Sequence, residues 1–104
     1  MPLTREFLET VQTRAKNDKA FRKALLTEAM NAYLTGDEAA GKSVLRTVVN
    51  ATVGFEGLAT LLGKPSKSLH RLLSPSGNPN TRSFFAILRV LPEEAGVKLT
   101  VRAA

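Results

Sequence analysis

The stretch FEGLATLLGKPSKSLHRLL, which runs from Phe55 to Leu73, has the residue pattern of two short helices joined by a tight turn. The small side chain of Ala59 allows two helices to cross closely, because a larger one would hold their axes apart. Gly63 can end the first helix in a left-handed conformation that would strain a residue with a Cβ atom. Pro65 suits the first turn of the next helix, since its φ is fixed and it lacks an N–H. We therefore expect a helix, a short turn and a second helix.

The second predicted helix, residues 66–73, has an apolar side and a basic side. At about 100° per residue, its leucines fall within about a third of the circumference and should face the core. These leucines are Leu69, Leu72 and Leu73. Lys67 and Arg71 then point nearly opposite, away from the core. The first predicted helix, residues 55–62, contributes Leu58 and Leu62 to the same core.

An outward basic pair on the second helix of such a motif favours contact with double-stranded DNA, because that helix can enter the major groove. Arg and Lys donate to guanine O6 and N7, while Ser and His can donate or accept at bases and phosphates. We predict base contacts from Ser66, Lys67, Ser68, His70 and Arg71. The alternative is that these residues form the solvated polar face of an ordinary surface helix.

The loop SPSGNPNTR, residues 74–82, favours a rigid turn over a flexible linker because it is rich in proline, glycine and asparagine. Either Asn80 or Thr81 can cap the next helix, which the apolar spacing of SFFAILRVL predicts. Backbone N–H groups at that cap are suited to binding phosphate. We predict DNA backbone contacts from Lys64, Asn78, Asn80 and Arg82. We interpret Pro75, Gly77 and Pro79 as structural turn residues.

The run GFEGLATLLGKPSKSLHRLLSPSGNP, residues 54–79, resembles the helix-turn-helix core of the HigA-like addiction-module antidotes, within the Xre and phage-repressor superfamily. The resemblance covers about the last half of the chain and rests on Gly63, the polar segment 65–68 and the loop residues Ser74, Pro75, Gly77, Asn78 and Pro79. Lys64 departs from the family pattern, in which the first turn residue is usually apolar. The resemblance implies an antitoxin that represses its own operon and has a small toxin as its partner.

The charge distribution agrees with a DNA-binding role. The 104 residues carry a formal net charge of +6, which suits a polyanionic partner but also serves solubility alone. No carboxylate occurs between Gly57 and Pro92, whereas that stretch contains the basic residues Lys64, Lys67, Arg71, Arg82 and Arg89. A solvated face would ordinarily mix both signs, so the acid-free stretch favours nearby phosphates.

The composition also excludes several classes of protein. The chain has no cysteine, so it offers neither disulfides nor thiol chemistry. No apolar run approaches the roughly 20 residues of a membrane span, and the sequence begins without a signal-peptide pattern. We expect a soluble, cytoplasmic protein of one compact domain.

The fold is expected to be mainly α, with five to six helices and one short C-terminal strand. Residues 1–53 should form a three-helix segment that packs on the helix-turn-helix region, residues 54–104. Thr4 and Asp37 are expected N-caps, and a second helix should cover 19–34. The first helix is indicated by apolar residues at helical spacing, namely Leu3, Phe7, Leu8, Val11 and Ala15.

The C-terminal segment GVKLTVRAA changes to a period of two. Val97, Leu99 and Val101 alternate with polar residues, which is typical of a half-buried strand. A lone strand cannot pair its own backbone groups, so we expect it to pair with the same strand of a second copy in a two-fold dimer. Such a dimer would place two recognition helices about 34 Å apart on a palindromic site.

The sequence lacks the parts of an enzyme site. It has a single histidine, His70, which falls on the predicted groove face, and its neighbouring carboxylates lie on one element where they cannot face each other across a substrate. Neither a glycine-rich phosphate loop nor metal-ligand spacing occurs, so we expect no catalytic residues, no cofactor and no metal site.

Two hypotheses for function remain. The first is a sequence-specific regulator that binds operator DNA as a dimer. The second is a protein-interaction module that binds a toxin or another protein partner, with DNA binding secondary or absent. The near-neutral segment 1–53 is where a protein partner would dock.

Overall fold

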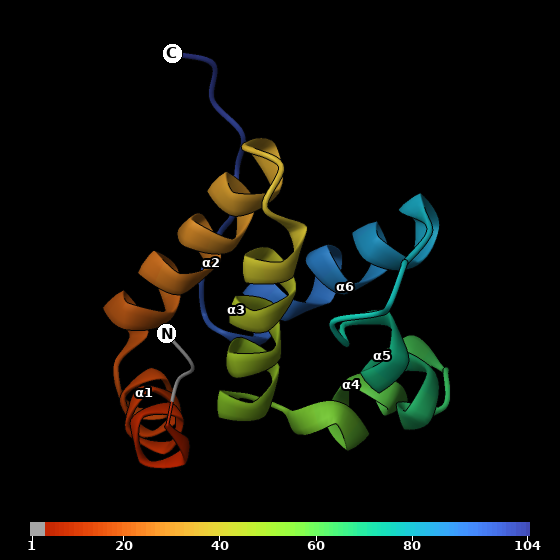
Figure 1. Ribbon diagram of the computed structural model, residues 1–104, viewed down its shortest axis with the longest axis horizontal. Coiled ribbons are helices and arrows are strands. Elements are labelled where there is room, and N and C mark those ends of the chain that lie inside the picture. Colours follow the sequence, from red (N-terminus) through yellow and green to blue (C-terminus); the bar gives the residue numbers. More distant parts are fainter. Residues whose placement is uncertain (1–3) are drawn as a thin grey trace.

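The computed structural model describes residues 4–104, and the expected position of Leu3 on the first helix lies outside this range. The described chain folds into helices α1 (Arg5–Asn17), α2 (Lys19–Leu34), α3 (Glu38–Ala51), α4 (Gly54–Leu62), α5 (Ser66–Leu72) and α6 (Thr81–Glu94) (Figure 1). The prediction of a mainly helical fold is therefore confirmed. Among these residues, no helix is both long and apolar enough to cross a lipid bilayer.

The first three helices begin where polar side chains cap them. The side chains of Thr4, Asp18 and Asp37 each accept a hydrogen bond from the backbone N–H three residues later, at 3.1 to 3.2 Å. Such caps satisfy N–H groups that have no partner within the helix. Helix α2 packs along α3, and α1 contacts both. Figure 1 shows α1 and α2 on one side of α3 and the pair α4 and α5 on the other.

One hydrophobic core joins the N-terminal helices to the C-terminal ones. The largest of its fully buried side chains come from α2, α3, α4, α6 and the α5 region, and they are Leu26, Leu45, Val48, Val49, Leu58, Leu69, Leu73, Ile87 and Leu91. The radius of gyration is 13.0 Å. This value equals the roughly 13 Å expected of one compact unit of about 100 residues.

Arg22 links the C-terminal ends of helices α1 and α6. Its guanidinium donates to the carbonyl oxygens of Ala15 at 2.9 Å and Lys16 at 3.2 Å, near the end of α1. It also donates to the carbonyl oxygen of Ala95 at 3.0 Å, at the end of α6. A cation at the C-terminal ends of two helices satisfies carbonyl groups that have no partner in the helix and complements both helix dipoles.

Helix α6 is longer than its sequence pattern predicts, because it continues through Pro92 to Glu94. Pro92 is buried in the last turn of α6. A proline this close to the end removes only one hydrogen bond of the helix, and its burial offsets part of that loss.

The predicted C-terminal strand is not seen in the single chain: residues 97–104 form no strand and pair with no strand among residues 4–104. The alternation itself is present: Val97 and Leu99 are half-buried against the core, whereas Val101 is 97% exposed. The N–H of Val97 donates to Pro92 O at 2.9 Å. The rest of the fold is helical and offers no sheet edge, so an alternating pattern alone cannot make a strand here.

Candidate nucleic-acid interface

Helices α4 and α5 form the predicted helix-turn-helix. Gly63 ends α4 in the left-handed conformation, with φ of 64° and ψ of 35°. The N–H of Lys64 then donates to Ala59 O at 3.1 Å and closes the end of the helix. A Cβ built on Gly63 would meet no atom within 4 Å. The glycine is therefore required by the backbone conformation and not by crowding.

Helix α5 restarts after Pro65, which has φ of −63° and ψ of 139°. Leu69 and Leu73 are fully buried and fix the inward side of α5, while Leu72 is half-buried. This burial leaves the opposite side of the helix at the surface. Lys67 and Arg71, the predicted outward pair, are both exposed.

The other predicted base-contact residues lie around that pair. Ser68 is half-buried and His70 is exposed. The imidazole of His70 stacks on the ring of Phe55 in α4, with centroids 3.8 Å apart and planes inclined by 20°. One face of the imidazole is therefore covered by Phe55, whereas the ring nitrogens, which bond in the plane of the ring, are not blocked by this stacking.

Ser66 contacts a residue that sequence reasoning missed. Its hydroxyl Oγ lies 2.9 Å from Oε1 of Glu56, which is exposed in the first turn of α4. Glu56 is the only carboxylate in residues 54–92. That isolation within a basic stretch was the sequence signal that could have singled it out.

The residues predicted to contact the DNA backbone gather near the start of α6. Nζ of Lys64 lies 3.2 Å from Oγ of Ser83. Asn80, not Thr81, caps α6, because its Oδ1 accepts the N–H of Ser83 at 2.8 Å. Asn78 and Arg82 are exposed. The turn thus brings Lys64 from the α4–α5 junction to the N-terminal end of α6.

Two cations from α3 hold the loop that follows α5, and neither was predicted. Lys42 is only 6% exposed, and its Nζ donates to Gly77 O at 2.7 Å and to Pro75 O at 3.3 Å. Arg46 donates through Nη1 to the carbonyl oxygen of Leu73, at the end of α5. These bonds to a charged donor fix the loop and the end of α5 on α3.

Gly77 allows the same loop to approach α5. A Cβ at this position would lie 2.0 Å from Arg71 O and 2.6 Å from Leu72 O. Such separations are far inside van der Waals contact, so only glycine fits. The interpretation of Gly77 as a structural turn residue agrees with this crowding.

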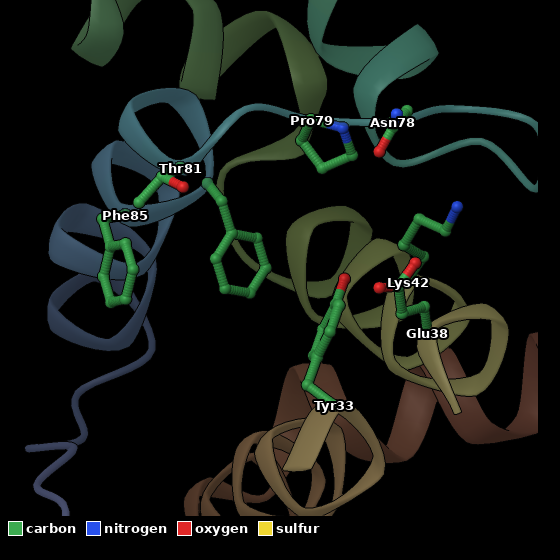
Figure 2. A pocket seen from close by; sticks show the side chains of 8 residues that line it. Tyr33, Glu38, Lys42, Asn78, Pro79, Thr81 and Phe85 are labelled. Carbon is green, nitrogen blue, oxygen red and sulfur yellow. The ribbon is translucent and has the colours of Figure 1, made fainter. Parts of the chain in front are cut away.

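A hollow of about 170 Å³ lies beside this loop (Figure 2). Its wall is formed by Tyr33, Glu38, Lys42, Asn78, Pro79, Thr81, Phe84 and Phe85. In Figure 2 the Tyr33 side chain lies between Glu38 and Lys42 on one side and Thr81 and Phe85 on the other. Burial raises the pKa of the Tyr33 hydroxyl, the Glu38 carboxylate raises this pKa further, and Arg46 lowers it.

The described chain does not bring together a group of three or more His, Asp or Glu side chains that could hold a metal ion. Comparison of the chain with protein-family models, with curated proteins and with solved structures finds no match.

Proposed function

We propose that this protein binds double-stranded DNA by inserting α5 into the major groove. The observation that carries the proposal is the exposure of Lys67 and Arg71 on the side of α5 opposite the buried Leu69 and Leu73. A recognition helix needs this arrangement, because its apolar side must be held by the domain while its outer side meets base edges. Arg71 and Lys67 are suited to donate to guanine O6 and N7.

Contacts to the DNA backbone would come from the turn before α5 and from the start of α6. Lys64 and Arg82 supply positive charge, while Asn78 and the amide nitrogen of Asn80 supply donors. Phosphate contacts of this kind set the register of a protein on DNA without reading sequence. The absence of carboxylates from Gly57 to Pro92 means that these residues add no negative charge to repel the phosphates.

We propose further that two copies bind together through their C-terminal segments. Residues 97–104 belong to no helix, apolar side chains alternate with polar ones over residues 97–101, and no strand among residues 4–104 pairs with this segment. Antiparallel pairing of two such segments would satisfy their backbone groups and form a two-fold contact. Two recognition helices related in this way suit a palindromic operator.

The biological role proposed is that of an antitoxin that represses its own operon, which follows from the resemblance to HigA-like antidotes. The alternative, a protein-interaction module, is favoured by one observation. Phe7 and Leu8 of α1 are 52% and 42% exposed. Helix α1 lies on the other side of α3 from the helix-turn-helix (Figure 1). Large apolar side chains exposed together often mark a protein contact. In the antitoxin role, this part of α1 would meet the toxin.

The test is binding of the purified chain to the duplex DNA upstream of its own reading frame, measured over a series of salt concentrations. Arg71→Ala should relax the base preference at one position and weaken specific binding by about 1 to 3 kcal/mol. Lys64→Ala should weaken binding to all sequences alike and lower the salt slope. If neither substitution changes binding, α5 does not enter the groove. If no duplex binds but a protein from the neighbouring reading frame does, the interaction module is the better description.

A further inference from the structure

The hydrogen bond between Ser66 and Glu56 has a fixed direction. A carboxylate can only accept, so the 2.9 Å contact must use the hydroxyl hydrogen of Ser66. A serine hydroxyl has one hydrogen and two lone pairs. With the hydrogen directed at Glu56, Ser66 presents only acceptor capacity to a molecule that approaches from outside.

An acceptor-only hydroxyl distinguishes between bases in the major groove. The exocyclic amino groups of adenine N6 and cytosine N4 are donors, so they match it. Guanine O6 and N7, thymine O4 and the phosphate oxygens are all acceptors, so they do not. The carboxylate of Glu56 is itself an acceptor and adds to the same preference.

We propose that Glu56 and Ser66 together read a base amino group, adenine N6 or cytosine N4, at one position of the operator. This inference rests on the proposed DNA-binding function. Ser66 is the first residue of α5, and the N-terminal residues of a recognition helix are those that reach base edges. Glu56 is the one negative charge in a stretch that otherwise suits phosphates, so an amino group gives this carboxylate a favourable partner at the DNA surface.

The experiment begins with selection of preferred duplexes from a random DNA library by the full chain. Each adenine in the selected site is then replaced by purine, which lacks the 6-amino group, and each cytosine by pyrimidin-2-one, which lacks the 4-amino group. One of these replacements should weaken binding of the wild-type protein by about fivefold, the loss of one hydrogen bond. This measurement needs no protein variant.

Two variants test whether Ser66 and Glu56 cause this loss of affinity. Ser66→Ala should discriminate less than the wild type between the intact and the amino-lacking duplex, because only the Glu56 carboxylate is left to accept from the amino group. Glu56→Gln should discriminate less, because a glutamine amide can donate to Ser66 Oγ and free the hydroxyl hydrogen to face the base. Glu94→Gln removes the same charge from an exposed carboxylate at the end of α6 and should keep the full discrimination.

The outcomes separate the two levels of the proposal. If duplexes are selected and Arg71 is needed for binding, but no amino-lacking replacement weakens binding, Glu56 and Ser66 do not recognise an amino group. The proposed DNA-binding function stands in that case. The proposed role of Glu56 and Ser66 is equally wrong if the loss of affinity for the amino-lacking duplex persists unchanged in Ser66→Ala and Glu56→Gln. If no duplex is enriched at all, the proposed DNA-binding function itself fails, and the proposed role of Glu56 and Ser66 fails with it.

Discussion

Lys42 and Gly77 are joined by a 2.7 Å hydrogen bond that links α3 to the loop after α5 across 35 residues of sequence. The same ammonium group reaches Pro75 O at 3.3 Å. A lysine that is only 6% exposed is held in place by the two backbone carbonyls that it satisfies. The position of the candidate DNA-binding surface therefore depends on a side chain outside the helix-turn-helix.

Replacing Lys42 tests this dependence. Lys42→Met keeps the apolar stem but leaves the carbonyls of Pro75 and Gly77 without their donor, so the free energy of unfolding should fall by about 1 to 3 kcal/mol. Urea denaturation measures the change. Lys23→Met, at an exposed position on α2, is the matched control and should stay within about 0.5 kcal/mol of the wild type. Equal stability of the two variants would contradict the structural role of Lys42.

The left-handed residue at the helix turn gives a second prediction. Gly63→Ala should lower the free energy of unfolding by about 1 to 2 kcal/mol, because a Cβ strains this conformation although no neighbouring atom crowds it. Gly63→Asn should lower the free energy of unfolding by less, since asparagine tolerates positive φ better than alanine. Thermal denaturation of the wild type and both variants measures their order of stability. An alanine variant that is as stable as the asparagine variant would show that α4 ends in another way.

Tyr33 gives a prediction for pH dependence. It is the only tyrosine of the chain, so the ultraviolet absorbance of tyrosinate reports its ionisation alone. Burial first, and the Glu38 carboxylate second, raise its pKa above the ordinary value of 10.0. The folded protein should therefore titrate at a higher pH than the same protein in concentrated urea. Coincident titration curves in the two states would refute the raised pKa.

The sign of the accompanying stability change follows from linkage. Above the ordinary tyrosine pKa the unfolded chain releases its proton while the folded chain keeps it, so stability falls as the pH rises through this window. Tyr33→Phe should remove this part of the alkaline destabilisation and leave the contribution of the lysines. Denaturation of both proteins at neutral and alkaline pH makes the comparison. An identical alkaline loss in both would exclude Tyr33 as a contributor.

The C-terminal segment gives the fourth prediction. Val101→Asp should leave the stability of the single chain within about 0.5 kcal/mol, because Val101 is 97% exposed. If two copies pair through residues 97–104, the same substitution should shift the protein towards monomer in sedimentation equilibrium. Thr100→Asp places the charge on the alternate side of the segment and should disturb the dimer less. A wild-type protein that stays monomeric would overturn the proposed dimer.

Local sequence patterns predicted most of the helices. The range expected for the second helix, 19–34, is that of α2, and the turn residues Gly63 and Pro65 lie where expected. These features depend on caps, glycine φ and leucine spacing, which act within a few residues. The strand at 97–101 was predicted by the same kind of pattern and is not seen in the single chain, because strand formation also needs a partner.

The amino-acid sequence by itself determined the helical class, the helix-turn-helix and the basic outward side of α5, because each follows from the order of neighbouring residues. Only the tertiary structure decided that Lys42 and Arg46 hold the loop after α5, that His70 stacks on Phe55, and that Ser66 donates to Glu56. These contacts join residues on different elements. They form only when the buried leucines have fixed α3, α4 and α5 against one another, and no local periodicity records that arrangement.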